Sequence, residues 1–171
     1  MVGSAASTDA AYEAGPRIAG AVSEDAAYQG DAASEGAAVS CPLAIVSPHA
    51  GLMYTGRVAA YAYRLVRGCS YEAVVLVGPS HYVAFDGVSI WPRGAWETPF
   101  GAVTMAEDLA AAVSASSPLI REHPAAHARE HSLEMQMPFI ARLLPRIPVA
   151  PLVMGHQTRE TADALGDALP R

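Results

Sequence analysis

The chain has 171 residues, 51% of them hydrophobic, and a formal net charge of −6 at pH 7. This length suffices for one domain with its own core, no apolar run is long enough to span a bilayer, and the first residues do not read as a signal peptide. We therefore expect a cytoplasmic protein without membrane contacts. Scattered arginines and the absence of lysine also disfavour a nucleic-acid binder, a P-loop and a Schiff-base enzyme.

Residues 1–40 differ in composition from the rest of the chain. They are rich in alanine, glycine and serine and carry six acidic side chains against Arg17, which leaves a net charge of −1 for the remainder. Such a segment buries too little apolar surface to offset its ordering entropy. We expect a disordered or weakly ordered tail, or alternatively a weakly packed arm, ahead of an α/β domain over residues 41–171.

Two apolar runs, residues 43–47 and 73–77, are typical of strands buried on both faces. Each ends close to a proline and is followed by a histidine, His49 or His81. The residues between the runs, 55–67, predict a helix that begins at Thr55 and buries one apolar face (Val58, Ala62, Leu65 and Val66). The sequence therefore predicts a βαβ unit.

A right-handed crossover makes the two strands of such a unit parallel, so that their carboxyl ends lie at one edge of the sheet. Open α/β sheets bind ligands at this edge. We therefore expect His49 and His81 to face one crevice, where two imidazoles begin a metal site. The alternative is that each histidine is a loop residue hydrogen-bonded to backbone.

The remaining pattern continues the α/β alternation. Residues 87–91 predict a strand, 96–101 a turn-rich loop, 105–113 a helix and 116–129 a longer loop. Residues 132–144 predict a helix that Pro138 kinks or delays, 149–154 a strand with Pro151 inside it, and 158–169 a helix capped by Thr158. The expected fold is an α/β sandwich whose central, mainly parallel sheet is flanked by helices and incomplete at the carboxyl terminus.

A metal site would need further ligands in addition to the two histidines. The candidates are Glu130, His131, Glu134 and His156, of which His156 follows a strand end and the other three are crowded into five residues. No GxSxG or GxGxxG sequence is present, which disfavours a serine hydrolase and a dinucleotide cofactor. Cys41 and Cys69 match neither a CxxC motif nor a disulfide framework, so both are expected to be reduced thiols.

Four motifs resemble the Memo-like family, called AmmeMemoRadiSam system protein B in prokaryotes. They are SPHAG, GPSH, TPFG and EHSLEMQ, at residues 47–51, 78–81, 98–101 and 130–136. The resemblance covers roughly residues 43–169. It implies a relation to class III extradiol dioxygenases, which are α/β sandwiches with a non-haem iron at the strand ends.

Carried over to this chain, the resemblance implies that His49 and His81 are metal ligands. It places His131 and Glu130 in the catalytic pocket, with Tyr54, Ser80 and Glu134 lining the substrate pocket. The implied metal is Fe(II), with copper or zinc as alternatives, and the implied partners are a radical-SAM protein and an AMMECR1-like protein. Two functions fit: a dioxygenase-like oxidoreductase, or a non-catalytic signalling module that holds a peptide or small ligand in the same crevice.

The chain also departs from the family pattern. The family's third ligand, in a later serine- and aspartate-containing motif, has no counterpart before Arg171, and the family's amino-terminal segment is not recognisable in residues 1–40. We therefore expect a partial Memo-like domain that binds metal weakly and has no robust activity alone. Its open sheet edge would favour self-association.

Overall fold

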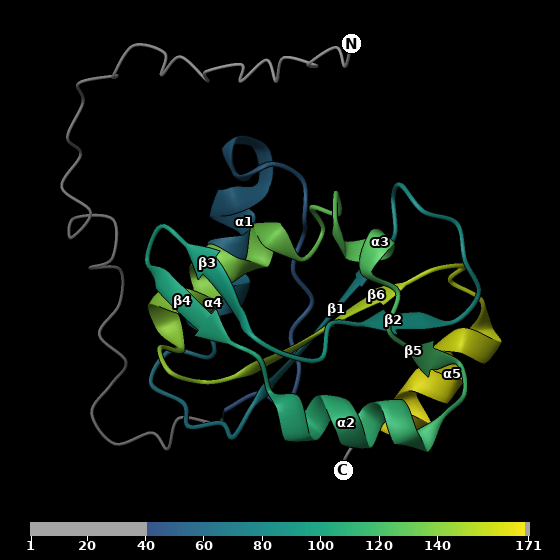
Figure 1. Ribbon diagram of the computed structural model, residues 1–171. Helices are drawn as coiled ribbons and strands as arrows, with labels where there is room; N and C mark the ends of the chain where they lie inside the picture. The colour runs from purple at the N-terminus through teal and green to yellow at the C-terminus, as the bar shows by residue number, and fades with distance from the viewer. Residues whose placement is uncertain (1–40, 170–171) are drawn as a thin grey trace, which may run out of the picture. The chain divides into compact units, whose positions relative to one another are not determined.

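The computed structural model describes residues 41–169, so the tail expected over residues 1–40 lies outside the described residues. A four-stranded sheet forms the centre, in the order β1-β6-β2-β5 (Figure 1). Its strands are β1 (Val74–Pro79), β2 (Val88–Ile90), β5 (Ile120–Arg121) and β6 (Val149–Met154). β1 is parallel to β6 and β5 to β2, while β2 runs antiparallel to β6. The sheet is therefore mainly parallel, as expected.

Helices cover both faces of this sheet. α1 (Leu52–Arg64) and α4 (Met137–Leu143) pack on one face, and α2 (Glu107–Ser116) and α5 (Arg159–Ala168) pack on the other (Figure 1). β6 shows why: Val149 and Val153 join the core beneath α1 and α4, while Leu152 joins the core with α2 and α5. Alternate residues of one buried strand thus build two cores. The α/β sandwich predicted from the sequence is confirmed.

The smaller elements were less well predicted. The segment expected as a turn-rich loop is a two-stranded hairpin, β3 (Ala95–Thr98) and β4 (Gly101–Thr104). The expected loop over residues 116–129 contains β5 and the short helix α3 (Pro124–His127). The helix expected from residue 132 begins as a 3₁₀ turn, η2 (Glu134–Gln136), and becomes α-helical only at α4, whose first turn holds Pro138 as expected of a delayed start.

The strand expected over residues 43–47 is absent, so the predicted βαβ unit is wrong. These residues run outside every strand, and Leu43 and Val46 are 101% and 96% exposed. Their sequence suits a buried strand, but β1 pairs with β6 and no described strand pairs with residues 43–47. The matched pair of parallel strands is therefore β1 with β6.

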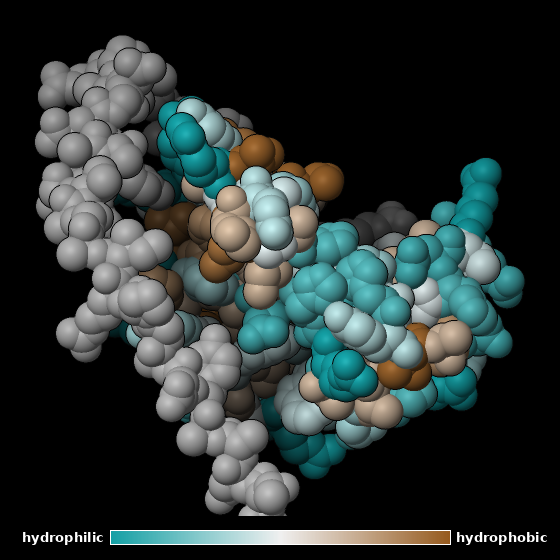
Figure 2. Space-filling model, turned by 90° about the horizontal axis from the view of Figure 1, so that it is seen from above, coloured by the Kyte–Doolittle hydropathy of each residue, from teal (hydrophilic) through white to brown (hydrophobic). Residues whose placement is uncertain are grey.

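α1 exposes more apolar surface than expected. It begins at Leu52 after Gly51, and Thr55 lies inside it, donating its hydroxyl to the Ala50 carbonyl instead of capping the helix. Of the residues expected in the core, Val66 is buried, whereas Val58 and Leu65 are exposed. Tyr63 is buried in the core as well. Figure 2 looks down on the side of the molecule that carries α1 and shows hydrophobic residues at the surface there. None of the described helices is both long and apolar enough to cross a membrane.

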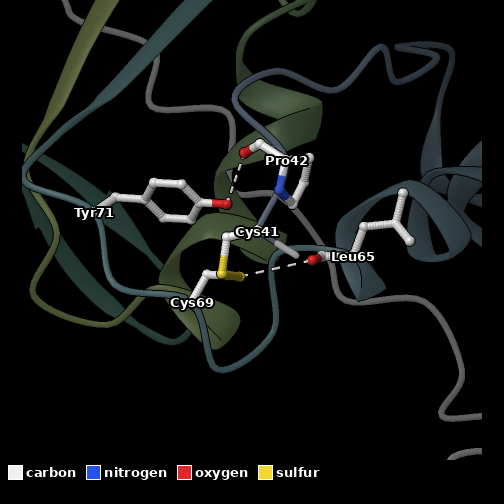
Figure 3. The surroundings of a disulfide bond; sticks show 5 residues. All are labelled: Cys41, Pro42, Leu65, Cys69 and Tyr71. Atoms are coloured by element: carbon white, nitrogen blue, oxygen red, sulfur yellow. Dashed lines mark hydrogen bonds between the residues drawn. A yellow bond between two sulfur atoms is a disulfide. The ribbon is translucent and has the colours of Figure 1, made fainter. Parts of the chain in front are cut away.

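Cys41 and Cys69 form a disulfide, which corrects the expectation of two reduced thiols (Figure 3). Their Cα atoms are 5.8 Å apart, although 28 positions separate them in sequence. The turn after α1 turns Cys69 back toward the start of the 41–49 segment, and the hydroxyl of Tyr71 donates to the Pro42 carbonyl beside the bridge at 2.9 Å. Such a pairing depends on where α1 ends, so spacing alone did not indicate it.

Candidate metal centre

Three histidines from separate segments converge beyond the end of β1. His81 follows β1 by two residues, His131 precedes η2, and His49 ends the extended segment that leads into α1. The ring centroids of His49 and His81 are 5.2 Å apart, those of His81 and His131 are 4.9 Å apart, and those of His49 and His131 are 6.4 Å apart. The expected convergence of His49 and His81 is thus found, although residues 43–47 do not form a strand.

Glu130 lies buried beneath these rings and is held at both carboxylate oxygens. Its Oε1 is 2.8 Å from His81 Nδ1 and accepts the Ser132 N–H at 2.9 Å, while Oε2 accepts the His81 N–H at 2.6 Å. His131 Nδ1 lies farther away, 3.8 Å from Oε1. Glu130 therefore fixes both the backbone and the ring of His81.

The close approach of these segments depends on Gly78. A Cβ atom at this position would lie 2.7 Å from both the Ser132 hydroxyl and the Leu133 side chain, which are themselves buried. Ser132 also donates its hydroxyl to the Pro79 carbonyl at 3.0 Å. Since only glycine leaves this space free, Gly78 allows residues 130–133 to lie against the end of β1 and brings Glu130 to His81.

The electrostatics favour a cation. Burial raises the pKa of Glu130, but the hydrogen bonds from the His81 backbone, the His81 ring and Ser132 outweigh it and lower the pKa to about 2. Burial lowers the pKa of His49, and the neighbouring His81 and His131 lower it further. The centre therefore combines an ionised carboxylate with a neutral imidazole whose lone pair is available to a metal.

These residues fit a metal ion. His81, Glu130 and His131 form a group whose potential ligand atoms lie within 4.8 Å of one another. A histidine bound at about 2.1 Å places its ring centroid about 3.2 Å from the metal, so two tetrahedral ligands have centroids about 5 Å apart. Both pairs match this spacing, His49 with His81 at 5.2 Å and His81 with His131 at 4.9 Å. Their ring orientations differ: the planes of His49 and His81 are tilted by 54°, whereas the rings of His81 and His131 are stacked at 22°.

The other residues proposed for the site lie around this centre or away from it. Ser80 and His156 line, with His81, an open pocket of about 370 Å³. His156 pairs with the exposed Asp86 at 2.9 Å and is not part of the metal-binding group. A larger groove of about 1420 Å³ lies on the His49 side. Tyr54, on α1, and Glu134, in η2, are exposed and line neither the pocket nor this groove.

One positioning residue was not recognised from the sequence. Gln136 is buried and donates its side-chain amide to the Pro48 carbonyl at 3.0 Å, which holds the residue preceding His49. The two residues are 88 positions apart, so no local pattern connects them. The available signal was that Gln136 closes the EHSLEMQ motif.

Comparison with known proteins identifies the family of this chain. The Memo-like protein family matches residues 10–171, farther toward the amino terminus than the four motifs extend. MEMO1 family proteins of Thermoplasma volcanium, Caldivirga maquilingensis and Methanothermobacter thermautotrophicus are 36%, 39% and 40% identical over 78%, 74% and 73% of this chain. The matched regions are 50%, 45% and 46% of those proteins, so the chain spans about half the length of these relatives. The chain belongs to the Memo-like protein family.

Proposed function

We propose that this protein binds one transition-metal ion through His49 and His81, with Glu130 orienting His81 and His131 carrying protons beside the metal. The observation that carries the proposal is the buried, doubly anchored Glu130 behind a histidine whose ring lies at ligand spacing from a second histidine. A carboxylate behind a metal-binding histidine is a recurrent arrangement because it fixes the ring and raises its basicity.

The tautomer of His81 follows from this arrangement. Since Glu130 is ionised at neutral pH, it accepts the hydrogen bond, and the proton lies on His81 Nδ1. In a neutral ring this leaves the Nε2 lone pair free for the metal. Glu130 uses its oxygens on His81 and Ser132, so it acts as a positioning residue.

The chemistry we propose is that of class III extradiol dioxygenases. Imidazole ligands suit iron, copper and zinc, and Fe(II) would supply oxygen activation next to a bound dihydroxylated aromatic. The pocket lined by Ser80, His81 and His156 offers space for a small ligand beside the metal. His131 stacks on His81 and is partly exposed, so it can exchange protons with both solvent and ligand.

A second function is a non-catalytic module that binds a peptide. The groove on the His49 side measures about 1420 Å³, above the range of about 300–1,000 Å³ for small-molecule pockets. Oxygen uptake with catechols after ferrous loading separates the two functions. Turnover supports the dioxygenase, and metal binding without turnover supports the module. For either function we propose a cytoplasmic location and the radical-SAM and AMMECR1-like partners implied by the family.

Metal stoichiometry tests the ligand assignment. Because binding through two histidines should be weak, metal is measured at equilibrium with free ferrous or cobalt ion. We expect the parent protein to bind it and the variants His49→Ala and His81→Ala not to. His156→Ala, which removes an exposed histidine outside the metal-binding group, is the matched control and should retain it. His131→Ala should bind the metal as the parent does. Loss of metal in His131→Ala together with retention in His49→Ala would instead assign the ion to His81, Glu130 and His131.

The role of Glu130 has a separate test. Glu130→Gln should weaken metal binding by about 10–100-fold because the amide no longer holds the His81 ring as an anionic acceptor. Glu134→Gln alters an exposed glutamate four residues away and should leave the affinity unchanged. Equal affinities for these two variants would contradict the positioning role.

A further inference from the structure

His156 shares a pocket with His81 but has no chemical role in the proposed function. It follows β6 by two residues, just as His81 follows β1 by two residues. β6 has a paired strand on each side, and the Ser80 N–H continues its pairing with β1 by donating to the Met154 carbonyl at 2.8 Å. The two histidines therefore leave the sheet at the carboxyl ends of adjacent parallel strands, which is where open α/β sheets bind ligands.

The pocket between these strand ends has the size of a small-molecule site. Residues 80–84 form one side and residues 155–157 the other, and the cavity measures about 370 Å³. Since small-molecule sites span about 300–1,000 Å³, this pocket suits a ligand of one aromatic ring. The described lining residues include His81, Tyr82 and His156 but neither a carboxylate nor an arginine. A ligand here therefore meets imidazole and hydroxyl groups instead of fixed charges.

The backbone of His156 is fixed against the loop that carries Asp86. The His156 N–H donates to the Phe85 carbonyl at 2.8 Å, and the Gly155 N–H donates to the Gly87 carbonyl at 3.0 Å. The approach is so close that a Cβ atom at position 155 would overlap the Phe85 carbonyl oxygen, which only glycine avoids. Because Asp86 lies between the two accepting residues, these bonds hold it beside His156.

Asp86 orients the ring of His156. Its Oδ1 lies 2.9 Å from His156 Nδ1. A carboxylate only accepts hydrogen bonds, so Nδ1 of the neutral ring carries the proton and Nε2 keeps its lone pair. Both side chains are exposed, and an exposed pair adds little stability. Since His156 is not part of the metal-binding group, its Nε2 is available to a ligand in the pocket.

We propose that His156 accepts a proton from an ortho-dihydroxylated aromatic ligand bound in this pocket, with Asp86 as its positioning residue. The proposal rests on the proposed function for the metal at His81 and for the class of ligand. A phenolic hydroxyl ionises at about pH 10, so at neutral pH it becomes an anionic metal ligand only when a base removes its proton. The O–H bond breaks, its electron pair stays on the oxygen, and the proton bonds to His156 Nε2. The new anion and Asp86 then both favour the charged imidazolium.

A first experiment measures ligand binding to the complete chain without metal. The probes are catechol, which has two O–H donors, and 1,2-dimethoxybenzene, which has none; each is titrated anaerobically and followed by NMR. We expect catechol to bind about fivefold more weakly to His156→Phe, which keeps a ring but loses the acceptor. 1,2-Dimethoxybenzene should bind the parent and His156→Phe equally. Asp86→Asn should weaken catechol binding, whereas Asp167→Asn, which changes an exposed aspartate on α5, should not.

A second experiment detects the proton transfer with zinc, which does not oxidise catechol. If His156 keeps the proton, the affinity of the zinc-loaded parent for catechol should change less than twofold between pH 7 and pH 8. Without this acceptor the proton passes to water, so the affinity of His156→Phe should rise about tenfold over the same interval. The zinc content is measured in every sample and should be equal in the parent and in His156→Phe.

Three results would overturn the proposal: catechol binding that His156→Phe leaves unchanged, equal weakening of catechol and 1,2-dimethoxybenzene, or the same pH dependence in both zinc-loaded proteins. Failure of the metal centre gives a different result. If the parent binds no zinc, the proposed function fails, while the metal-free comparison of the two probes still decides whether His156 accepts from the ligand.

Discussion

Removal of the Cys41–Cys69 disulfide should strongly destabilise the protein. The bridge closes a loop with a sequence separation of 28, for which the chain-entropy relation gives a loss of about 12 cal/mol/K in the unfolded state, or about 3.6 kcal/mol at 25 °C. The hydrogen bond from Tyr71 to the Pro42 carbonyl does not involve the bridge, and we expect the folded state to keep it when the bridge is removed. Most of the effect should therefore arise in the unfolded chain.

Equilibrium unfolding in urea measures this difference. The oxidised parent is compared with the double variant Cys41→Ser/Cys69→Ser, and the thiol content of the parent is determined first. We expect the free energy of unfolding to fall by about 3–4 kcal/mol and the dependence on urea to steepen, because the unfolded chain expands when the loop is opened.

The bridge also anchors the segment that ends at His49. The double variant should therefore bind metal more weakly than the parent, although none of the proposed ligands has been changed. A difference in unfolding free energy below about 1 kcal/mol would refute the loop-entropy argument, and an unchanged metal affinity would show that the contacts of Pro42 and Pro48 alone hold the segment.

Three further predictions concern the core and the helices. Gly78→Ala should cost about 1–3 kcal/mol in thermal unfolding and weaken metal binding, because its Cβ would displace Ser132 and Leu133, whereas Gly166→Ala on α5 meets no atom within 4 Å and should not destabilise. Burial lowers the pKa of His127 to about 4, against about 6.5 in the unfolded chain, so stability is complete above pH 6.5 and falls as the pH decreases toward 4. The loss should reach about 2.5 kcal/mol by pH 4.5 in urea unfolding and be absent in His127→Gln. Thr158→Ala removes the acceptor of the Thr161 N–H at the start of α5 and should cost about 1 kcal/mol in urea unfolding, while Thr158→Ser should cost little.

Local patterns predicted several of the elements whose partners lie within the described chain. The strand at residues 73–77 and the strand at 149–154 are present as β1 and β6, with β6 continuous through Pro151. Pro151 is tolerated there because its carbonyl accepts the Trp91 N–H and proline has no N–H that needs a partner. Thr158 caps α5 as predicted, since a cap needs only contacts within one turn.

Predictions that required knowledge of distant contacts were less successful. The disulfide and the bond from Gln136 to Pro48 join residues 28 and 88 positions apart, and neither has a local signature. Glu130 was identified as a site residue, but its place behind His81 depends on how closely residues 130–133 approach β1 at Gly78. Sequence therefore pointed to Glu130 as a candidate and left its contacts with His81 to the structure.

The failed strand prediction is itself informative. Residues 43–47 have the composition of a buried strand, yet they are unpaired and largely exposed beside a strand that is paired on one side. Composition reflects the environment for which a segment was selected, whereas hydrogen bonding reflects the partners that are present. Residues 43–47 and β1 both line the large groove, and both have the sequence of a buried strand although part of their backbone is unpaired within the described residues. His49 ends the unpaired segment and His81 follows β1, so the two histidines that we propose as metal ligands are held at the ends of these two segments.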